Sequence, residues 1–547
     1  MRFSTGSPRW KGHPLTPDLA LLTRGEVDRP LRHRVWDRSW TPGRKRSAKL
    51  DMKLQLLPAG RCDANPRVLL IAEAANPDWF SEPLLGWSHS QAIAAVTPTH
   101  LVTQERNREA ILRARLPAQA FTAINSEAIA APICRLSTLL RGGSDKAWTT
   151  FAALNAISYP YFEWLVWKKF ASRLRRGEFD LVHRLTPVSP TLPSLLATKL
   201  AGCGIPFVLG PLNGGTPWPA GFDSVRQKER EWLGYLRGAH KLLPGYESTR
   251  GRSAAIIVAS CAAFNEVSER YRDKCVYIPE NAIDPARFNL RVAGPVRTPL
   301  RVAFVGRLVP YKGADMLLEA AAPLIRQGKL TVDIIGDGPE MPWLRRFVAQ
   351  EGIATGVRLD GWVEHSQLQH RLVQSDIFGF PSVREFGGAV VLEAMALGLV
   401  PIVLDYGGPA ELVTESTGYL VPIGQRTQIV ARFRQVLTRL AADPSGLRQM
   451  GKRARNRVLQ QFTWEAKARQ VLEVYRWAVR ARPDKPNFGM PFPDSPRLVP
   501  SIGFGGQRAG RRGAVGGVAG RGGVVWHFSG AVWWQVSVVG GGSRRGA

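Results

Sequence analysis

The residues of this chain that are best placed for chemistry flank a glycine pair, Gly387–Gly388. Glu385 precedes the pair and Glu393 follows it, and the apolar run 377–380 before them is typical of a buried strand. A strand, a glycine turn and a helix in this order present free backbone N–H groups that suit a phosphate. Carboxylates accept hydrogen bonds from sugar hydroxyls. The pattern predicts a nucleotide-sugar site; the alternative is a solvated loop glutamate and an ordinary helix glutamate.

A second charged segment, 306–313, supplies two cations, Arg307 and Lys312, directly after the predicted strand 301–305. Open α/β sheets bind ligands at the carboxyl ends of their strands. When the bond between a sugar and a diphosphate breaks, negative charge builds on the phosphate oxygens, and fixed cations stabilise it. We therefore expect both side chains at a diphosphate; the alternative is a pair of surface cations in a loop.

Both segments resemble motifs of the retaining glycosyltransferases of family 4 (glycosyl transferase group 1), which have the GT-B fold. Residues 385–393 stand where that family has its E-x7-E motif, and 306–313 look like its G-R-x4-K-G motif. The likeness covers most of the chain from Pro66 to Arg482 and is densest after Leu300.

The resemblance implies a role for each motif residue. It implies that Arg307 and Lys312 bind the donor diphosphate, that Glu393 bonds the ribose, and that Glu385 lies near the donor sugar. By resemblance, the catalytic candidates are His183, Glu385, Arg307 and Lys312, and the donor-binding candidates are Gly306, Arg307, Lys312, Gly336, Asp337, Val363, Glu385, Gly387, Gly388, Ala389 and Glu393.

Three of these positions have particular alternatives. Gly336 and Asp337 form a glycine turn after a predicted strand, and Asp337 also suits a turn or helix cap. His183 closes the predicted strand 180–184 and resembles the family histidine that lines the acceptor side and touches the donor sugar, but it also suits a structural histidine. The family's glycine-rich loop after the first strand is poorly matched by 73–77.

Strands alternating with helices predict an α/β protein of the GT-B class, with two Rossmann-like doubly wound parallel-sheet domains facing across a cleft. Expected strands include 67–72, 377–380 and 400–404, and a helix is expected at 88–95. The expected organisation is a basic, disordered or loosely attached extension at 1–65, an acceptor domain at 66–298, a donor domain at 299–462, a helix crossing back to the first domain at 463–482, and a disordered Gly/Arg-rich tail at 483–547.

Composition restricts the classes of partner. The formal net charge is +30, and the two chain ends carry roughly half of it. A basic surface favours nucleotide-sugar phosphates, anionic lipid headgroups or nucleic acid. The five cysteines are scattered, odd in number and form no C-x-x-C pair, which argues for a reducing compartment and against a disulfide framework or a structural zinc site.

The sequence thus predicts a glycosyltransferase, a retaining hexosyltransferase by resemblance, that needs no metal and no cofactor and uses a UDP- or GDP-sugar as substrate. The acceptor is a glycan, a lipid or a small molecule. We expect a cytoplasmic protein, with peripheral contact with an anionic membrane at its inner face left open, because no secretory signal and no apolar stretch of about twenty residues is present. No nucleic-acid partner is expected. The alternatives are an epimerase or phosphorylase of the same fold, a non-catalytic sensor of nucleotide sugars, and a basic nucleic-acid-binding protein.

Overall fold

The computed structural model describes residues 65–79, 81–128, 148–228 and 239–489. The predicted extension at 1–65 and the predicted tail at 483–547 therefore lie outside the described residues, apart from their inner ends.

A parallel sheet of seven strands forms the core of the first domain within the described residues, in the order β3-β2-β1-β4-β5-β6-β7. Its strands are β1 (Val68–Ala72), β2 (Thr99–Gln104), β3 (Phe121–Ile124), β4 (Leu181–Thr186), β5 (Phe207–Leu212), β6 (Ala255–Val258) and β7 (Cys275–Tyr277). Its helices are α1 (Glu82–Ala94), α2 (Arg108–Arg113), α4 (Trp148–Arg175), α5 (Leu195–Gly202), α6 (Asp223–Lys228), α7 (Tyr246–Arg252) and α8 (Cys261–Glu266). Every residue of β1 is apolar and buried, as expected for a strand covered on both faces.

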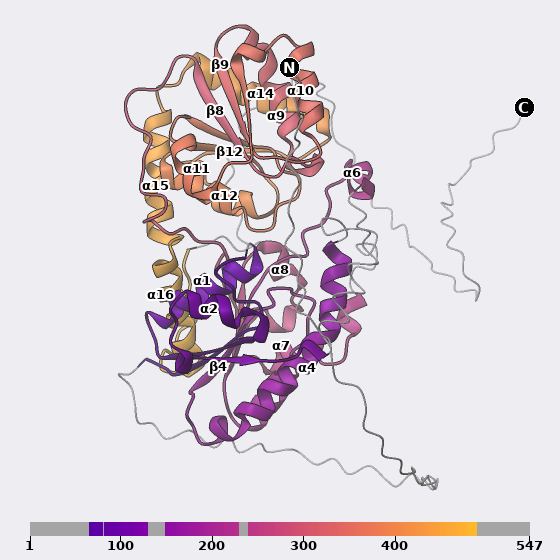
Figure 1. The fold of residues 1–547 in the computed structure, drawn as a ribbon, viewed down its shortest axis with the longest axis vertical. Coiled ribbons are helices and arrows are strands. Elements are labelled where there is room, and N and C mark those ends of the chain that lie inside the picture. The colour runs from indigo at the N-terminus through magenta and orange to yellow at the C-terminus, as the bar shows by residue number, and fades with distance from the viewer. Residues whose placement is uncertain (1–64, 80, 129–147, 229–238, 490–547) are drawn as a thin grey trace, which may run out of the picture. The chain divides into compact units, whose positions relative to one another are not determined.

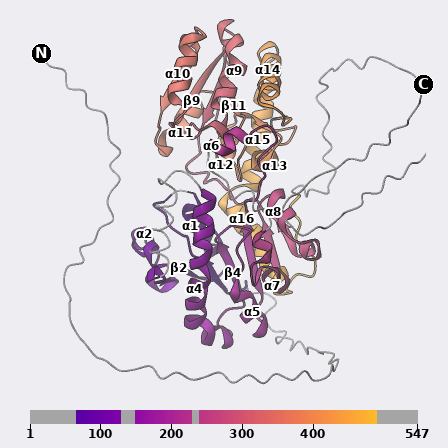
Figure 2. The same ribbon diagram turned by 90° about the vertical axis from the view of Figure 1, so that its right-hand side faces the viewer.

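A second parallel sheet has six strands in the described part of the chain, in the order β10-β9-β8-β11-β12-β13. Its strands are β8 (Leu300–Val305), β9 (Leu330–Ile335), β10 (Val357–Gly361), β11 (Ile377–Phe380), β12 (Val400–Leu404) and β13 (Tyr419–Val421). The helices that follow are α9 (Ala314–Arg326), α10 (Met341–Gln350), α11 (His365–Leu372), α12 (Ala389–Leu397), α13 (Gly407–Leu412), α14 (Arg426–Ala442), α15 (Leu447–Gln461) and α16 (Trp464–Ala478). Figure 2 shows α9, α10 and α14 beside this sheet.

Both sheets have the doubly wound strand order, so the expected fold class of two Rossmann-like parallel-sheet domains is confirmed. The order reverses between β1 and β4 in the first sheet and between β8 and β11 in the second. Both sheets belong to one compact unit of the chain.

The last helix, α16, packs against the first sheet although it follows the second in sequence, and Figure 1 shows it beside α1. Its residues Val471, Val474 and Tyr475 are buried in the same apolar cluster as β1 and β4. The Tyr475 hydroxyl lies 2.6 Å from His183 Nδ1. Helix α16, the last helix of the described residues, therefore packs against the first domain.

Two kinds of sequence-based expectation need correction. Helix α1 begins at Glu82 rather than at residue 88, because Pro83 occupies its first turn, where a missing N–H costs no hydrogen bond. Among the described strands and α-helices, seven were not anticipated: β3, α6, α7, α8, α11, α13 and β13. Among the described residues, every helix is too short or too polar to cross a membrane.

Candidate active site

The loops after β8 and β11 lie side by side where the strand order of the second sheet reverses. Gly313 ends the first loop with a φ of 77°, and a methyl group built on it would lie 2.6 Å from the carbonyl oxygen of Pro381 in the second. In open α/β sheets, ligands bind outside the carboxyl ends of the strands at this reversal. The topology thus brings both charged motifs to the position where a ligand is expected.

Lys312 and Glu385 come from these two loops and form an ion pair, with Lys312 Nζ donating to Glu385 Oε2. Their side chains are 19% and 18% exposed, so both charges are partly desolvated while still reachable. An attraction of this kind is stronger than on an open surface, because less water screens it. The structure therefore unites two of the four residues predicted to be catalytic.

Arg307, the second predicted cation, is exposed and lies on the same loop. Its Nη2 atom donates to the Tyr311 hydroxyl at 3.2 Å, and the Tyr311 ring centre is 5.7 Å from Lys312 Nζ. Tyr311 thus stands beside both cations. A guanidinium that is held by a neutral phenol keeps its charge available for an anion.

Helix α12 begins directly after the glycine pair. Gly388 is its N-cap with a φ of 67°, a conformation that favours glycine, and Ala389 is its first residue. The N–H groups of a first helical turn have no acceptor within the helix and carry partial positive charge. Gly387, Gly388 and Ala389 therefore lie at the N-terminal end of α12, directly after the loop that holds Glu385, and their predicted contacts with an anion stay predictions.

Glu393 lies one turn into α12 and makes a contact that the sequence did not predict. Its Oε1 atom is 2.9 Å from Nε2 of His365, and Nδ1 of the same ring is 2.6 Å from Nη2 of Arg287. His365 begins α11, and Arg287 lies in the segment between β7 and β8. Because these polar contacts join distant segments, no local pattern revealed them.

Gly306 and Gly336 directly follow β8 and β9 and lie in contact. A methyl group built on Gly336 would overlap the carbonyl oxygen of Gly306, so the turn at Gly336 has no room for a side chain. Asp337 is exposed, and its Oδ1 atom accepts from the N–H of Gly338 at 2.7 Å, which is the geometry of a turn residue. Val363 is half-buried just after β10. Their predicted contacts with a nucleotide stay predictions.

The hydrogen bonds of His183 involve none of the site residues described above. It is fully buried in β4, with Nδ1 at 2.6 Å from the Tyr475 hydroxyl and Nε2 at 2.5 Å from the carbonyl oxygen of Gly210. Burial lowers its pKa to about 4, so the ring is neutral at pH 7. Both ring nitrogens are occupied by protein partners. This geometry supports the structural alternative for His183 rather than contact with a donor sugar.

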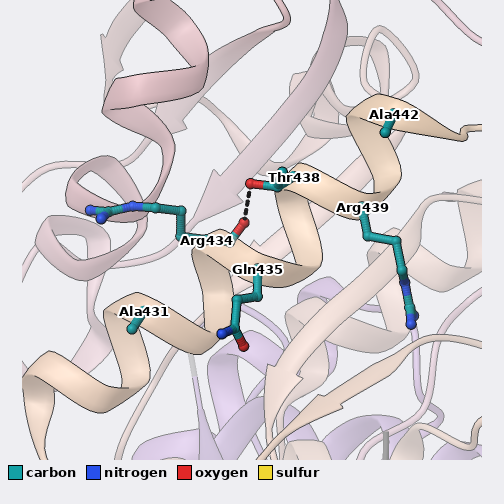
Figure 3. Close-up of a pocket in the computed structure, with 6 residues that line it drawn as sticks. All are labelled: Ala431, Arg434, Gln435, Thr438, Arg439 and Ala442. Carbon is teal, nitrogen blue, oxygen red and sulfur yellow. Dashed lines mark hydrogen bonds between the residues drawn. The ribbon is translucent and has the colours of Figure 1, made fainter. Parts of the chain in front are cut away.

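A hollow of about 510 Å³ lies elsewhere, along α14 (Figure 3). It is lined by residues of that helix: Ala431, Arg434, Gln435, Thr438, Arg439 and Ala442. The Thr438 hydroxyl bonds the Arg434 carbonyl within the helix at 2.8 Å. None of the predicted site residues lines this hollow, and the convergence of charged groups lies at the sheet edge instead.

The pattern of the family described as "Glycosyl transferases group 1" matches residues 287–457. An alpha-maltose-1-phosphate synthase of Mycobacterium tuberculosis is 31% identical over 281 residues, which cover 46% of this chain and 70% of that protein. The chain belongs to the glycosyl transferases group 1 family. The matched region contains Arg307, Lys312, Glu385 and Glu393.

Other proteins are less similar in sequence to this group 1 chain. A glycogen synthase of Mycobacterium tuberculosis is 29% identical over 233 residues, 42% of this chain, and the chain spans about half of that relative's length, 55%. A sucrose-phosphate synthase structure from Thermosynechococcus elongatus gives a TM-score of 0.49 at 18% identity, over 76% of this chain and 100% of that one.

Proposed function

We propose that this protein is a glycosyltransferase that moves a sugar from a nucleoside diphosphate sugar to an acceptor hydroxyl. The observation that carries the proposal is the Lys312–Glu385 pair beside the N-terminus of α12. A diphosphate needs cations and N–H donors, and a sugar needs a carboxylate. Arg307, Lys312 and the first turn of α12 supply the former, and Glu385 supplies the latter.

The reaction follows from these groups. As the glycosidic bond breaks, charge grows on the leaving diphosphate, and Arg307, Lys312 and the helix end are already oriented toward it. These fixed charges do the work that a divalent cation does in other phosphate sites, so we propose transfer without metal or other cofactor. Glu393, held by His365, is proposed to bond the ribose.

Retention of configuration is proposed from the family resemblance. The acceptor would approach on the face that the diphosphate leaves, and a phosphate oxygen would take the proton of its hydroxyl. The new bond joins the acceptor oxygen to the anomeric carbon as the bond from that carbon to the phosphate oxygen breaks. The UDP or GDP base and the acceptor class, whether glycan, lipid or small molecule, are left to experiment.

The test is a thermal-shift screen of UDP-glucose, UDP-galactose, UDP-N-acetylglucosamine and GDP-mannose. A cognate donor present at about 100 times its Kd stabilises the fold by about 2.7 kcal/mol, which raises the melting temperature measurably. If neither these four compounds nor a wider set of nucleotide sugars raises the melting temperature, the proposal is contradicted. Conversion of the sugar in the absence of any acceptor would instead favour an epimerase.

A further inference from the structure

Two buried polar side chains follow β5 in the first domain and have unused hydrogen-bonding atoms. Asn213 and Thr216 are each 4% exposed. Asn213 Oδ1 accepts from the N–H of Gly214 at 2.8 Å, whereas Asn213 Nδ2 and Thr216 Oγ1 have no hydrogen-bond partner among the described residues. Buried polar groups are nearly always paired in folded proteins, so two such atoms in one short loop need an explanation.

A third unused atom belongs to Glu280, which follows β7. Its Oε2 atom is buried and unpaired within the described part of the chain. Burial raises the pKa of Glu280 to about 7, and the side chain of Asn213, which is close enough to interact with this carboxyl group, opposes that rise. Asn213 thus lies beside Glu280.

Glu280 and Thr216 lie near the loop after β11, which holds Glu385, Gly387 and Gly388. A methyl group built on Gly387 would lie 2.7 Å from Glu280 Oε1. One built on Gly407 would lie 2.6 Å from the carbonyl oxygen of Glu385 and 3.8 Å from Thr216 Cγ2. Glu280 and Thr216 of the first domain therefore lie near the loop that holds Glu385 and Gly387.

We propose that Asn213, Thr216 and Glu280 bind hydroxyl groups of the donor sugar beside Gly387. An amide N–H donates, a carboxyl oxygen accepts, and a threonine hydroxyl does either, which is the mixture that a polyhydroxylated ring requires. The inference rests on the proposed function and deepens it, because it assigns these residues to the sugar rather than to the nucleotide.

The experiment compares binding of a nucleotide with binding of its sugar conjugate by titration calorimetry. The pairs are UDP with UDP-glucose and GDP with GDP-mannose, measured on the full chain and on Thr216→Val, Thr216→Ser and Glu280→Gln. Valine keeps the contact of Thr216 Cγ2 with Gly407 but removes the hydroxyl, and serine keeps the hydroxyl. Thr438→Val, on α14, removes a hydroxyl far from the motif residues and is the matched control.

We expect Thr216→Val and Glu280→Gln to bind the nucleotide as the wild type does and to bind the sugar conjugate about tenfold more weakly, the size of one lost polar contact. Thr216→Ser and Thr438→Val should match the wild type. An unchanged difference between conjugate and nucleotide in folded Thr216→Val and Glu280→Gln contradicts the subsite alone. Wild-type protein that binds none of the four compounds contradicts the proposed function as well.

Discussion

At the scale of single residues, the central feature is the partly buried ion pair between Lys312 and Glu385. Its two members come from loops that lie far apart in sequence and are joined by the sheet. Because both side chains are partly buried, each charge is stabilised by the opposite one. Both side chains still keep some exposed surface that a ligand can reach. Because neither side chain is part of the apolar core, we expect their replacement to leave the fold intact.

Lys312→Met and Glu385→Gln should each lower kcat/KM for sugar transfer about 100-fold or more, because each removes a preorganised group from the reacting centre. Circular dichroism should show an unchanged fold. The matched control is the exposed Arg326–Glu351 ion pair on α9 and after α10, where Arg326→Met and Glu351→Gln should retain full transfer. Full activity of either site variant would argue against a role for this pair.

A buried amine gives the protein a distinct dependence of stability on pH. Lys467 is fully buried in α16, its Nζ donates to the carbonyl oxygen of Pro279, and burial lowers its pKa from 10.5 to about 7. Between these values the unfolded chain binds a proton that the folded chain does not. Stability therefore rises with pH across this window and is lost as pH falls toward 7.

Compared with Lys467→Met, the wild type should gain up to about 1.4 kcal/mol of unfolding free energy per pH unit between pH 8 and pH 10. Glu280, with a pKa of about 7, is ionised throughout this range in the wild type. Urea unfolding at each pH provides the measurement. Parallel stability profiles for the two proteins would show that Lys467 is charged in the folded state.

At the scale of elements, the N-terminus of α12 depends on the absence of a side chain at Gly387. A methyl group there would overlap the amide nitrogen of Asn281 and crowd Glu280. Gly387→Ala should thus displace the helix end and weaken donor binding about tenfold or more, measured by calorimetry. Gly446→Ala, at the N-cap of α15 with open space around it, is the control and should bind normally. Equal affinities would mean that the helix end does not hold the donor.

Elements with strong apolar periods were predictable, and polar or short ones were not. Strand β11 and helix α10 were predicted with their observed bounds, because their apolar spacing and flanking turn residues agree. Helix α11 was not predicted, because most of its residues are polar and only Leu368 and Leu372 are buried. Strand β3 was not predicted either, because only two of its four residues are buried.

The meeting of the loops that hold Lys312 and Glu385 could be predicted from sequence, because each loop directly follows a strand with a strong apolar pattern. The partners of those loops could not be predicted. His365 meets Glu393, and Glu280 meets Gly387, through tertiary packing between segments whose local patterns are unremarkable. The bonding of His183 was likewise hidden, since it depends on Tyr475, which is remote in sequence.

At the scale of the whole molecule, one carboxylate links elements of the two sheets' domains. Glu411 of α13 is 6% exposed; its Oε1 accepts from the N–H of Cys261 at 3.0 Å and its Oε2 from the Tyr277 hydroxyl. Removal of one member of a buried hydrogen-bonded set costs about 1–3 kcal/mol of unfolding free energy.

Glu411→Ala should therefore lower the free energy of unfolding by about 2 kcal/mol and reduce the cooperativity between the two domains. Scanning calorimetry should show a lower and broader transition. The double-mutant cycle with Tyr277→Phe should give a non-zero coupling energy. Additive effects of the two changes would mean that this contact does not join the domains.

The most direct test of the proposed function is a crystal structure of the protein with a bound nucleoside diphosphate sugar. We predict diphosphate oxygens within about 3 Å of Lys312 Nζ and of the first N–H groups of α12, with the sugar beside Glu385. A ligand bound elsewhere, for example in the hollow along α14, with Lys312 and Glu385 still paired only to each other, would contradict it.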